Sequence, residues 1–166
     1  MAVPAAKKQL ALDTNILLDL AAGEDFAHDF IEAFRENGYA LKVPPTVVQE
    51  LAFSGFHSKG LKQQRALGAL QNLREWGIEP YDLKSVGHGI TEQFARRLIH
   101  KRLLPDDELN DGLILAETAL AHIPVLATSD KHLLDIEARE LAEVFDERHL
   151  SHVTPAHPKG LLKAMR

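Results

Sequence analysis

The chain has 166 residues, of which 45% are hydrophobic and 26% charged, a composition typical of a single globular domain over residues 1–166. It contains no cysteine, which excludes disulfides, thiolate metal sites, cysteine nucleophiles and iron–sulfur clusters. Its 19 basic and 24 acidic residues give a net charge of −5, so the protein lacks an overall basic coat for gripping duplex DNA.

Short apolar runs alternate along the chain with longer segments of helical periodicity. The strand that ends at Leu83 is expected to be weak, because Pro80 lies inside it. In chain order the expected elements are a strand (9–13), a helix (14–20), a helix (24–37), a strand (39–43), a helix (58–76), a strand (78–83), a helix (91–104), a helix (106–122), a strand (124–128), a short helical segment from Lys131, a strand (150–154) and a helix (160–165).

A further helix start is predicted directly after the second strand. Thr46 and Gln49 have the spacing of a capping box, with Thr46 at the N-cap and Gln49 at the third helical position. This arrangement leaves Glu50 free to point away from the helix start.

Strands that alternate with helices predict a parallel sheet whose two faces are both covered by helices. We therefore expect an α/β fold of the three-layer α/β/α type, with a central, mostly parallel sheet. In such sheets ligands bind at the carboxyl ends of the strands.

Acidic residues from four regions of the sequence are expected at that edge. Asp13 closes the first strand, Glu50 lies early in the helix after the second strand, and Asp130 follows the late strand. Asp107 and Asp111 are spaced i,i+4 and are expected to share one face of the 106–122 helix.

Each of these carboxylates has a simpler interpretation when it is taken alone. Asp13, Asp107 and Asp130 suit helix N-caps, Glu50 suits a solvated helix face, and the Asn-Asp-Gly run at Asp111 suits a surface turn. Taken together, uncompensated carboxylates repel one another, and a divalent cation with oxygen ligands relieves that repulsion. The pattern favours Mg²⁺ or Mn²⁺ and metal-assisted hydrolysis of phosphodiester bonds.

Four segments of the sequence carry a resemblance to the PIN-domain family of nucleases, to which many toxins of bacterial type II toxin–antitoxin pairs belong. They are LALDTNILLDL (10–20), VPPTVVQEL (43–51), LNDGLILAETA (109–119) and VLATSDKHLL (125–134). The opening Asp-Thr-Asn and the late Thr-Ser-Asp, each after a buried strand, are the more specific of these motifs.

The resemblance implies a role for each matching position. Asp13, Glu50 and Asp111 look like metal-binding and catalytic residues, and Asp130 looks like the fourth acidic position. Three polar positions are similar to those that orient carboxylates or water, namely Thr14, Asn15 and Ser129. Asp107 is an additional candidate metal ligand, one helical turn from Asp111. The resemblance also implies Mg²⁺ or Mn²⁺ as cofactor, RNA as substrate and an antitoxin protein as partner, and it leaves a homodimer open.

An acidic centre repels a polyanion, so a nuclease also needs positive charge nearby. One candidate nucleic-acid-binding strip lies on the helix predicted near residue 100 and consists of Arg96, Arg97, Lys101 and Arg102. A second lies at the start of the 58–76 helix and consists of Lys59, Lys62 and Arg65. Both strips have a simpler interpretation as solvated helix faces. Only 6% of the residues are aromatic, so no base-stacking platform is evident.

The leading hypothesis is a metal-dependent endoribonuclease that acts as the toxin of a toxin–antitoxin pair. The main alternative is a non-catalytic PIN-like module that binds RNA or protein, although such a module would be expected to have lost some of its acidic positions. A phosphatase of the haloacid dehalogenase type is disfavoured, because that class needs a second aspartate where this chain has Asn15.

The sequence gives no sign of a membrane segment or a cleaved signal peptide. The longest stretch without formal charge, 118–129, contains Pro124 and is too short to span a bilayer. The N-terminal residues have two lysines but no apolar core of a signal peptide. We therefore expect a soluble, cytoplasmic protein.

Overall fold

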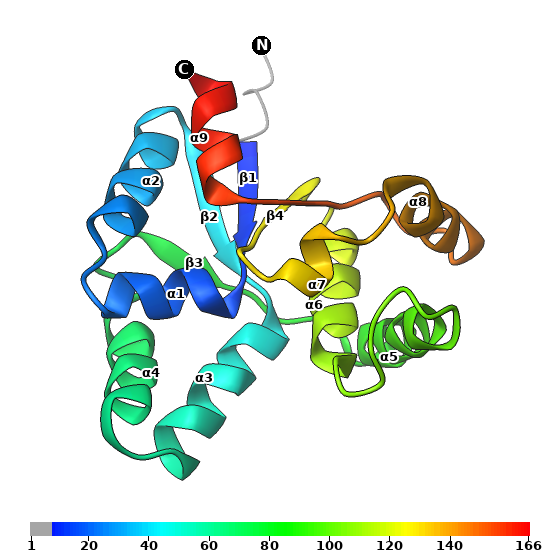
Figure 1. Cartoon of the computed structure of the whole chain (residues 1–166), viewed down its shortest axis with the longest axis horizontal. Helices are drawn as coiled ribbons and strands as arrows, with labels where there is room; N and C mark the ends of the chain where they lie inside the picture. Colours follow the sequence, from blue (N-terminus) through cyan, green and yellow to red (C-terminus); the bar gives the residue numbers. More distant parts are fainter. Residues whose placement is uncertain (1–7) are drawn as a thin grey trace.

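The computed structural model describes residues 8–166, which form a parallel sheet covered by helices on both faces (Figure 1). This architecture confirms the three-layer α/β/α prediction. The strands are β1 (Lys8–Leu12), β2 (Tyr39–Val43), β3 (Ile78–Pro80), β4 (Val125–Ala127) and β5 (Thr154–Ala156). The helices are α1 (Thr14–Ala21), α2 (Asp25–Glu36), α3 (Pro45–His57), α4 (Gly60–Asn72), α5 (Ser85–His100), α6 (Leu109–Leu120), α7 (Lys131–Leu134), α8 (Ala138–Glu147) and α9 (Pro158–Met165).

The strand order is β3-β2-β1-β4-β5, and each neighbouring pair is parallel. The chain first steps outward from β1 to β2 and β3, and then crosses back over β1 to β4 and β5. The order therefore changes direction between β1 and β4. In open α/β sheets this switch point is where loops separate and leave a crevice at the carboxyl ends of the strands.

The two directions of travel place the helices in two layers. Because crossovers between parallel strands are right-handed, the outward steps put α1 to α4 on one face and the return steps put α5 to α8 on the other. In Figure 1 α1, α2 and α4 lie to the left of β1, and α5, α6 and α8 lie to its right. The last helix, α9, packs against α2 and closes the first layer.

The central strands supply the middle of the core, while both outer strands carry a proline. Leu10, Leu12 and Leu126 are almost completely buried between the two helical layers. Pro80 lies in β3 and Pro155 in β5, and each of these strands pairs on one side only. An edge strand can accept a proline because it needs no donor on its free side. The weak strand predicted around Pro80 is confirmed, but it ends at Pro80 itself.

The predicted capping box at Thr46 is wrong. Helix α3 begins two residues earlier, with Pro45 as its first residue and Pro44 as N-cap. Proline is well suited to that position, because its fixed φ is helical and its missing N–H would have no partner there. The Thr46 hydroxyl instead donates to Glu117 of α6, at 2.6 Å.

Helix α8 was not expected from the sequence, although its pattern is amphipathic. Leu141, Val144 and Phe145 recur at helical spacing and are buried, and the side chain of Glu137 accepts a hydrogen bond from the Glu140 amide at the helix start. The strand expected over 150–154 also shifts, because the amide of Leu150 donates to Phe145 and closes the end of this helix. Strand β5 therefore begins only at Thr154.

Across residues 8–166, no helix is both long enough and apolar enough to cross a membrane. The prediction that no signal peptide precedes the fold concerns residues that lie mostly outside this described range.

Candidate active site

The candidate site lies at the switch point, where β1 and β4 end side by side. Leu12 pairs with Ala127, and the amide of Asp13 donates to the Ala127 carbonyl at 3.0 Å. The two motifs that follow these strands, Asp13-Thr14-Asn15 and Thr128-Ser129-Asp130, are thereby brought together from opposite ends of the sequence.

Asp13 is buried, and both of its carboxylate oxygens accept hydrogen bonds. Oδ1 accepts from the Thr14 amide at 2.7 Å, which makes Asp13 the N-cap of α1. Oδ2 accepts from the Thr128 hydroxyl at 2.7 Å and from the Asn15 amide at 3.1 Å. Asp13 is therefore a helix N-cap, as its simpler interpretation predicted. It also joins the Asp13-Thr14-Asn15 motif to the Thr128-Ser129-Asp130 motif.

Asn15 and Thr128 complete this link and orient Asp130. The Asn15 Oδ1 accepts from the Ser129 amide at 3.0 Å, and the Thr128 hydroxyl oxygen accepts from the Asp130 amide at 3.0 Å. Asp130 caps α7 through a 2.9 Å bond from the His132 amide. Thr128 is a site residue that sequence reasoning missed, although its place at the head of the Thr-Ser-Asp motif offered a signal.

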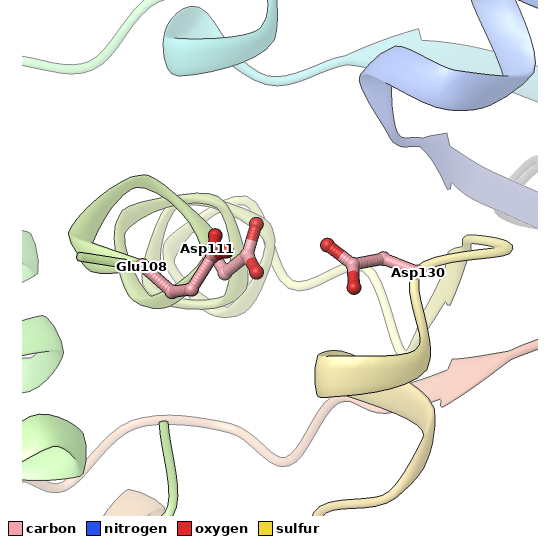
Figure 2. A group of neighbouring side chains, drawn as sticks. All are labelled: Glu108, Asp111 and Asp130. Carbon is pink, nitrogen blue, oxygen red and sulfur yellow. The ribbon is translucent and has the colours of Figure 1, made fainter. Parts of the chain in front are cut away.

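Three carboxylates form the centre of the site. Glu108 and Asp111 come from the start of α6, and Asp130 approaches from the loop after β4 (Figure 2). One oxygen of each lies within 4.8 Å of one oxygen of the other two. Asp111 Oδ2 is buried and has no hydrogen-bond partner. A buried carboxylate oxygen without a donor is costly, so this atom indicates a missing positive partner.

Burial and mutual repulsion disfavour the charged forms of these groups. Burial, followed by repulsion from Asp130 and Asp13, raises the pKa of Asp111 to about 9. Burial also raises the pKa of Asp13 above its ordinary value, although the hydrogen bonds from Thr128 and Thr14 oppose that rise. At neutral pH the cluster can be fully ionised only with a cation beside it.

The donor set fits a hard divalent cation. All three groups of the cluster offer oxygen, and Mg²⁺ and Mn²⁺ prefer carboxylate oxygen together with water and phosphate. The partnerless Asp111 Oδ2 supplies a donor atom that the protein itself does not satisfy. The predicted ligands Asp111 and Asp130 thus belong to the central group, whereas both oxygens of Asp13 already accept hydrogen bonds within the protein.

Glu50 reaches the site from α3. Its Oε1 accepts from the Thr14 hydroxyl at 3.1 Å, and the side chain is half-buried. Burial raises its pKa to about 7, against the lowering by Thr14, and repulsion from Asp13, Glu108 and Asp130 adds to the rise. Glu50 therefore faces the carboxylates from the opposite helix without joining the central group.

The start of α3 is held by a buried residue that sequence reasoning missed. Glu117 of α6 accepts the Thr46 amide at 3.0 Å and the Thr46 hydroxyl at 2.6 Å, so it caps α3 from another helix. Burial raises the pKa of Glu117. This contact links α3, which carries Glu50, to α6, which carries Asp111.

The helical placement of Asp107 is wrong. Helix α6 begins at Leu109, so Asp107 lies in an exposed turn and does not share a helix face with Asp111. The turn instead places Glu108 beside Asp111, and Glu108 Oε1 lies 3.9 Å from His132 Nε2. Because the helix starts three residues later than predicted, Glu108 takes the place beside Asp111 that was expected for Asp107.

The predicted basic strip on α5 is largely paired with carboxylates. Arg96 donates to Glu92 at 2.9 Å on the same helix. Arg97 and Lys101 both face Glu147 of α8, at 3.2 and 3.7 Å. Arg102 follows in the turn after α5, with a positive φ of 60°. The two contacts with Glu147 connect the end of α5 to α8. A nucleic-acid role for the strip remains a prediction.

Comparison with known proteins adds three findings. The family model described as PIN domain matches residues 10–139, which is most of the chain. No curated protein matches it. Among solved structures, the chain is similar to one chain of the crystal structure of VapBC2 from Rickettsia felis bound to a DNA fragment from their promoter. The TM-score is 0.62 with 17% identity, and the match covers 90% of this chain and 98% of that one, which is a likeness of fold.

Proposed function

Since the chain belongs to the PIN-domain family, we propose that it is a divalent-metal-dependent endoribonuclease that hydrolyses RNA phosphodiester bonds. The cofactor in this proposal is Mg²⁺ or Mn²⁺. When bound, such an ion neutralises charge on the phosphate and lowers the pKa of a water molecule.

The observation that carries the proposal is the partnerless Asp111 Oδ2 within the carboxylate cluster. A purely structural acidic cluster is normally compensated by hydrogen bonds or basic side chains. On the β1–β4 side the Asp13 oxygens are compensated in that way, whereas Asp111 Oδ2 is not. A cation at Asp111 explains the difference.

The residues divide the work between them. We assign Asp111 and Asp130, together with Glu108, to holding the ion, and Asp13 to supporting Asp130 through Thr128, whose hydroxyl both residues contact. Asn15 and Thr128, with the Ser129 amide, fix the position of Asp130. Glu50 accepts a hydrogen bond from Thr14 and lies close enough to Asp13, Glu108 and Asp130 to be repelled by them. We assign it to orienting or deprotonating the attacking water.

We further propose that the protein is the toxin of a toxin–antitoxin pair and acts in the cytoplasm. Two things support this proposal, namely membership of a family that includes many such toxins and the likeness of fold to a chain of VapBC2. An antitoxin protein is accordingly the expected partner.

Thermal unfolding with and without millimolar Mn²⁺ or Mg²⁺ tests the metal site directly. An ion that binds only the folded protein must raise the Tm of the wild type. We expect that rise to vanish in Asp111→Asn and to persist in Asp107→Asn, the matched control from the neighbouring exposed turn. Cleavage of a mixed cellular RNA pool then tests the activity. A wild type that shows neither a metal-dependent Tm rise nor RNA cleavage would support the non-catalytic binding module instead.

A further inference from the structure

The helical hairpin formed by α3 and α4 exposes an unusual amount of apolar surface. Phe53 and Phe56 of α3 are 66% and 78% exposed, and Leu61 of α4 is 64% exposed. The hairpin extends away from the sheet, with the turn between its helices at the far end (Figure 1). Large exposed apolar side chains grouped on a protruding element indicate a binding surface.

The hairpin holds these rings in place. A Cβ added at Gly55 would lie 2.7 Å from Leu67 Cδ2, so the two helices approach closely at this glycine. Gln63 of α4 donates to the Gly55 carbonyl at 3.0 Å. On the outer surface the rings of Phe53 and His57 lie 4.5 Å apart between centroids, with their planes 40° apart. The two helices are therefore fixed against each other, and Phe53 and His57 form a ring pair on their outer surface.

The hairpin also differs in charge from the rest of the chain. Residues 51–73 contain three basic residues and no acidic one, in a protein of net charge −5. Arg65 is attracted to Asp19 of α1, but no salt bridge among residues 8–166 involves Lys59 or Lys62, both of which are exposed. Two exposed lysines that enter no salt bridge with the described residues thus belong to the same hairpin as the exposed aromatic rings.

This surface is aligned with the candidate active site. Glu50, Phe53 and His57 are spaced i, i+3 and i+7, so they share one face of α3. At about 1.5 Å of rise per residue, His57 lies roughly 10 Å along the helix from Glu50. A strand that runs over the rings would therefore arrive at the carboxylate cluster.

We propose that the α3–α4 face, defined as Phe53, Phe56, His57, Lys59 and Lys62, is a platform on which unpaired bases of single-stranded RNA stack while the two lysines contact its phosphates. Every base presents a π-face to an aromatic ring, and basic side chains follow the backbone. This inference rests on the proposed function, since it names how the substrate reaches that same site.

The charges favour RNA over protein occupants of the face. A second copy of this chain would bring Lys59 and Lys62 toward their own equivalents, and like charges in contact disfavour self-association. An acidic protein would complement the charge of the lysines, but only RNA offers both phosphates for the lysines and flat bases for the aromatic rings. Both alternatives give distinct results in the experiment below.

The experiment measures fluorescence anisotropy of a labelled 12-nucleotide oligouridylate in EDTA, where metal-dependent cleavage does not occur. We compare wild type with the double variant Phe53→Ala/Phe56→Ala and with Val86→Ala, an equally exposed apolar control on α5. We expect the double variant to bind roughly tenfold or more weakly, given the strength of base–aromatic stacking. The control should match wild type, and equal Tm values should verify that all variants are folded.

The lysines have a separate readout. Lys59→Gln/Lys62→Gln should lower the slope of log affinity against log salt by about 1.4, since each phosphate contact on a single strand contributes about 0.7. The matched control is Lys84→Gln/Lys163→Gln, which removes two exposed lysines elsewhere and should leave the slope unchanged.

The outcomes separate this inference from the proposed function. RNA binding that is unchanged in Phe53→Ala/Phe56→Ala overturns the platform, even if wild type cleaves RNA and Asp111→Asn does not. RNA binding that depends on both rings supports the platform, even if no cleavage is ever seen. Self-association that Phe53→Ala/Phe56→Ala abolishes, with no effect on RNA binding, would assign the face to a second copy. Ring-dependent binding of labelled polyglutamate in place of RNA would assign it to an acidic protein.

Discussion

The two sides of the acidic site differ in how their carboxylates are satisfied. On the β1–β4 side, Asp13 accepts three hydrogen bonds and Asp130 is oriented by Thr128 and by its own cap of α7. On the α6 side, Asp111 Oδ2 is buried without a partner. The carboxylates on the first side are satisfied by hydrogen bonds within the protein, whereas Asp111 on the second side needs a cation as its partner. We regard the first side as the frame of the site, which also presents Asp130 to the ion, and the second side as its working part.

The largest effect is expected on RNA cleavage by Asp111→Asn. Loss of a direct metal ligand should lower cleavage by more than the roughly 10–100-fold typical of outer partners. Cleavage with Mn²⁺ should therefore fall by over about 100-fold, with circular dichroism unchanged. Asp107→Asn is the control and should cleave like wild type. Full activity in Asp111→Asn would contradict the assignment.

Asn15→Ala removes part of the frame without removing a ligand. The variant loses the hydrogen bond that the Asn15 side chain donates to Asp13 and the one that it accepts from the Ser129 amide, so Asp130 would no longer be held in position. We expect cleavage and Mn²⁺ affinity to fall together by about 10–100-fold. Titrating activity against Mn²⁺ measures both, and part of the activity should return at high Mn²⁺.

Without metal, substitutions at Asp13 and at Asp111 should change the Tm in opposite directions. Asp13→Ala removes the acceptor of a helix cap worth about 0.5–2 kcal/mol, so its Tm should fall by roughly 1–8 °C. Asp111→Asn removes the free-energy cost of protonating a buried carboxyl on folding, so in EDTA its Tm should rise above that of wild type by a few degrees. Calorimetry of the two variants in EDTA at pH 8 decides the matter. Equal shifts of the same sign would erase the distinction between frame and working part.

Metal-free stability should also depend on pH. The pKa of Asp111 is about 9 in the folded protein and near 3.8 in the unfolded chain, so folding takes up a proton between these values. Glu50 also takes up a proton on folding between pH 4.5 and about 7, because its pKa is raised over that range. Their contribution to stability is therefore complete below pH 4 and is lost as the pH rises toward 9. Tm in EDTA should decline more steeply from pH 5 to 9 in wild type than in Asp111→Asn, whereas saturating Mn²⁺ should remove the decline.

The smallest effect is expected at the α5 strip. Because Arg97 and Lys101 face Glu147 of α8, Arg97→Gln should change RNA affinity by no more than about twofold. The same anisotropy assay measures it beside Lys59→Gln/Lys62→Gln. A larger loss from Arg97→Gln would move the nucleic-acid path from the α3–α4 face to α5.

Errors in the sequence analysis concentrate at helix ends. Asp107 and Glu108 are neighbours, and only the point at which α6 begins decides which of them approaches Asp111. Thr46 looks like a cap, but its hydroxyl and amide bind Glu117, which lies 71 residues away. Terminal residues have few local hydrogen bonds, so distant partners override local preference there.

By itself, the sequence determined the alternation of strands and helices, the parallel sheet, and the placement of Asp13 and Asp130 at strand ends. These follow from periodicity and from the order of elements, which are local properties of the chain. Only the tertiary structure decided that both oxygens of Asp13 would accept hydrogen bonds and Asp111 Oδ2 would not, and that Phe53 and Phe56 would stay exposed. Burial and hydrogen-bond partners depend on which elements pack together, and no local pattern encodes that.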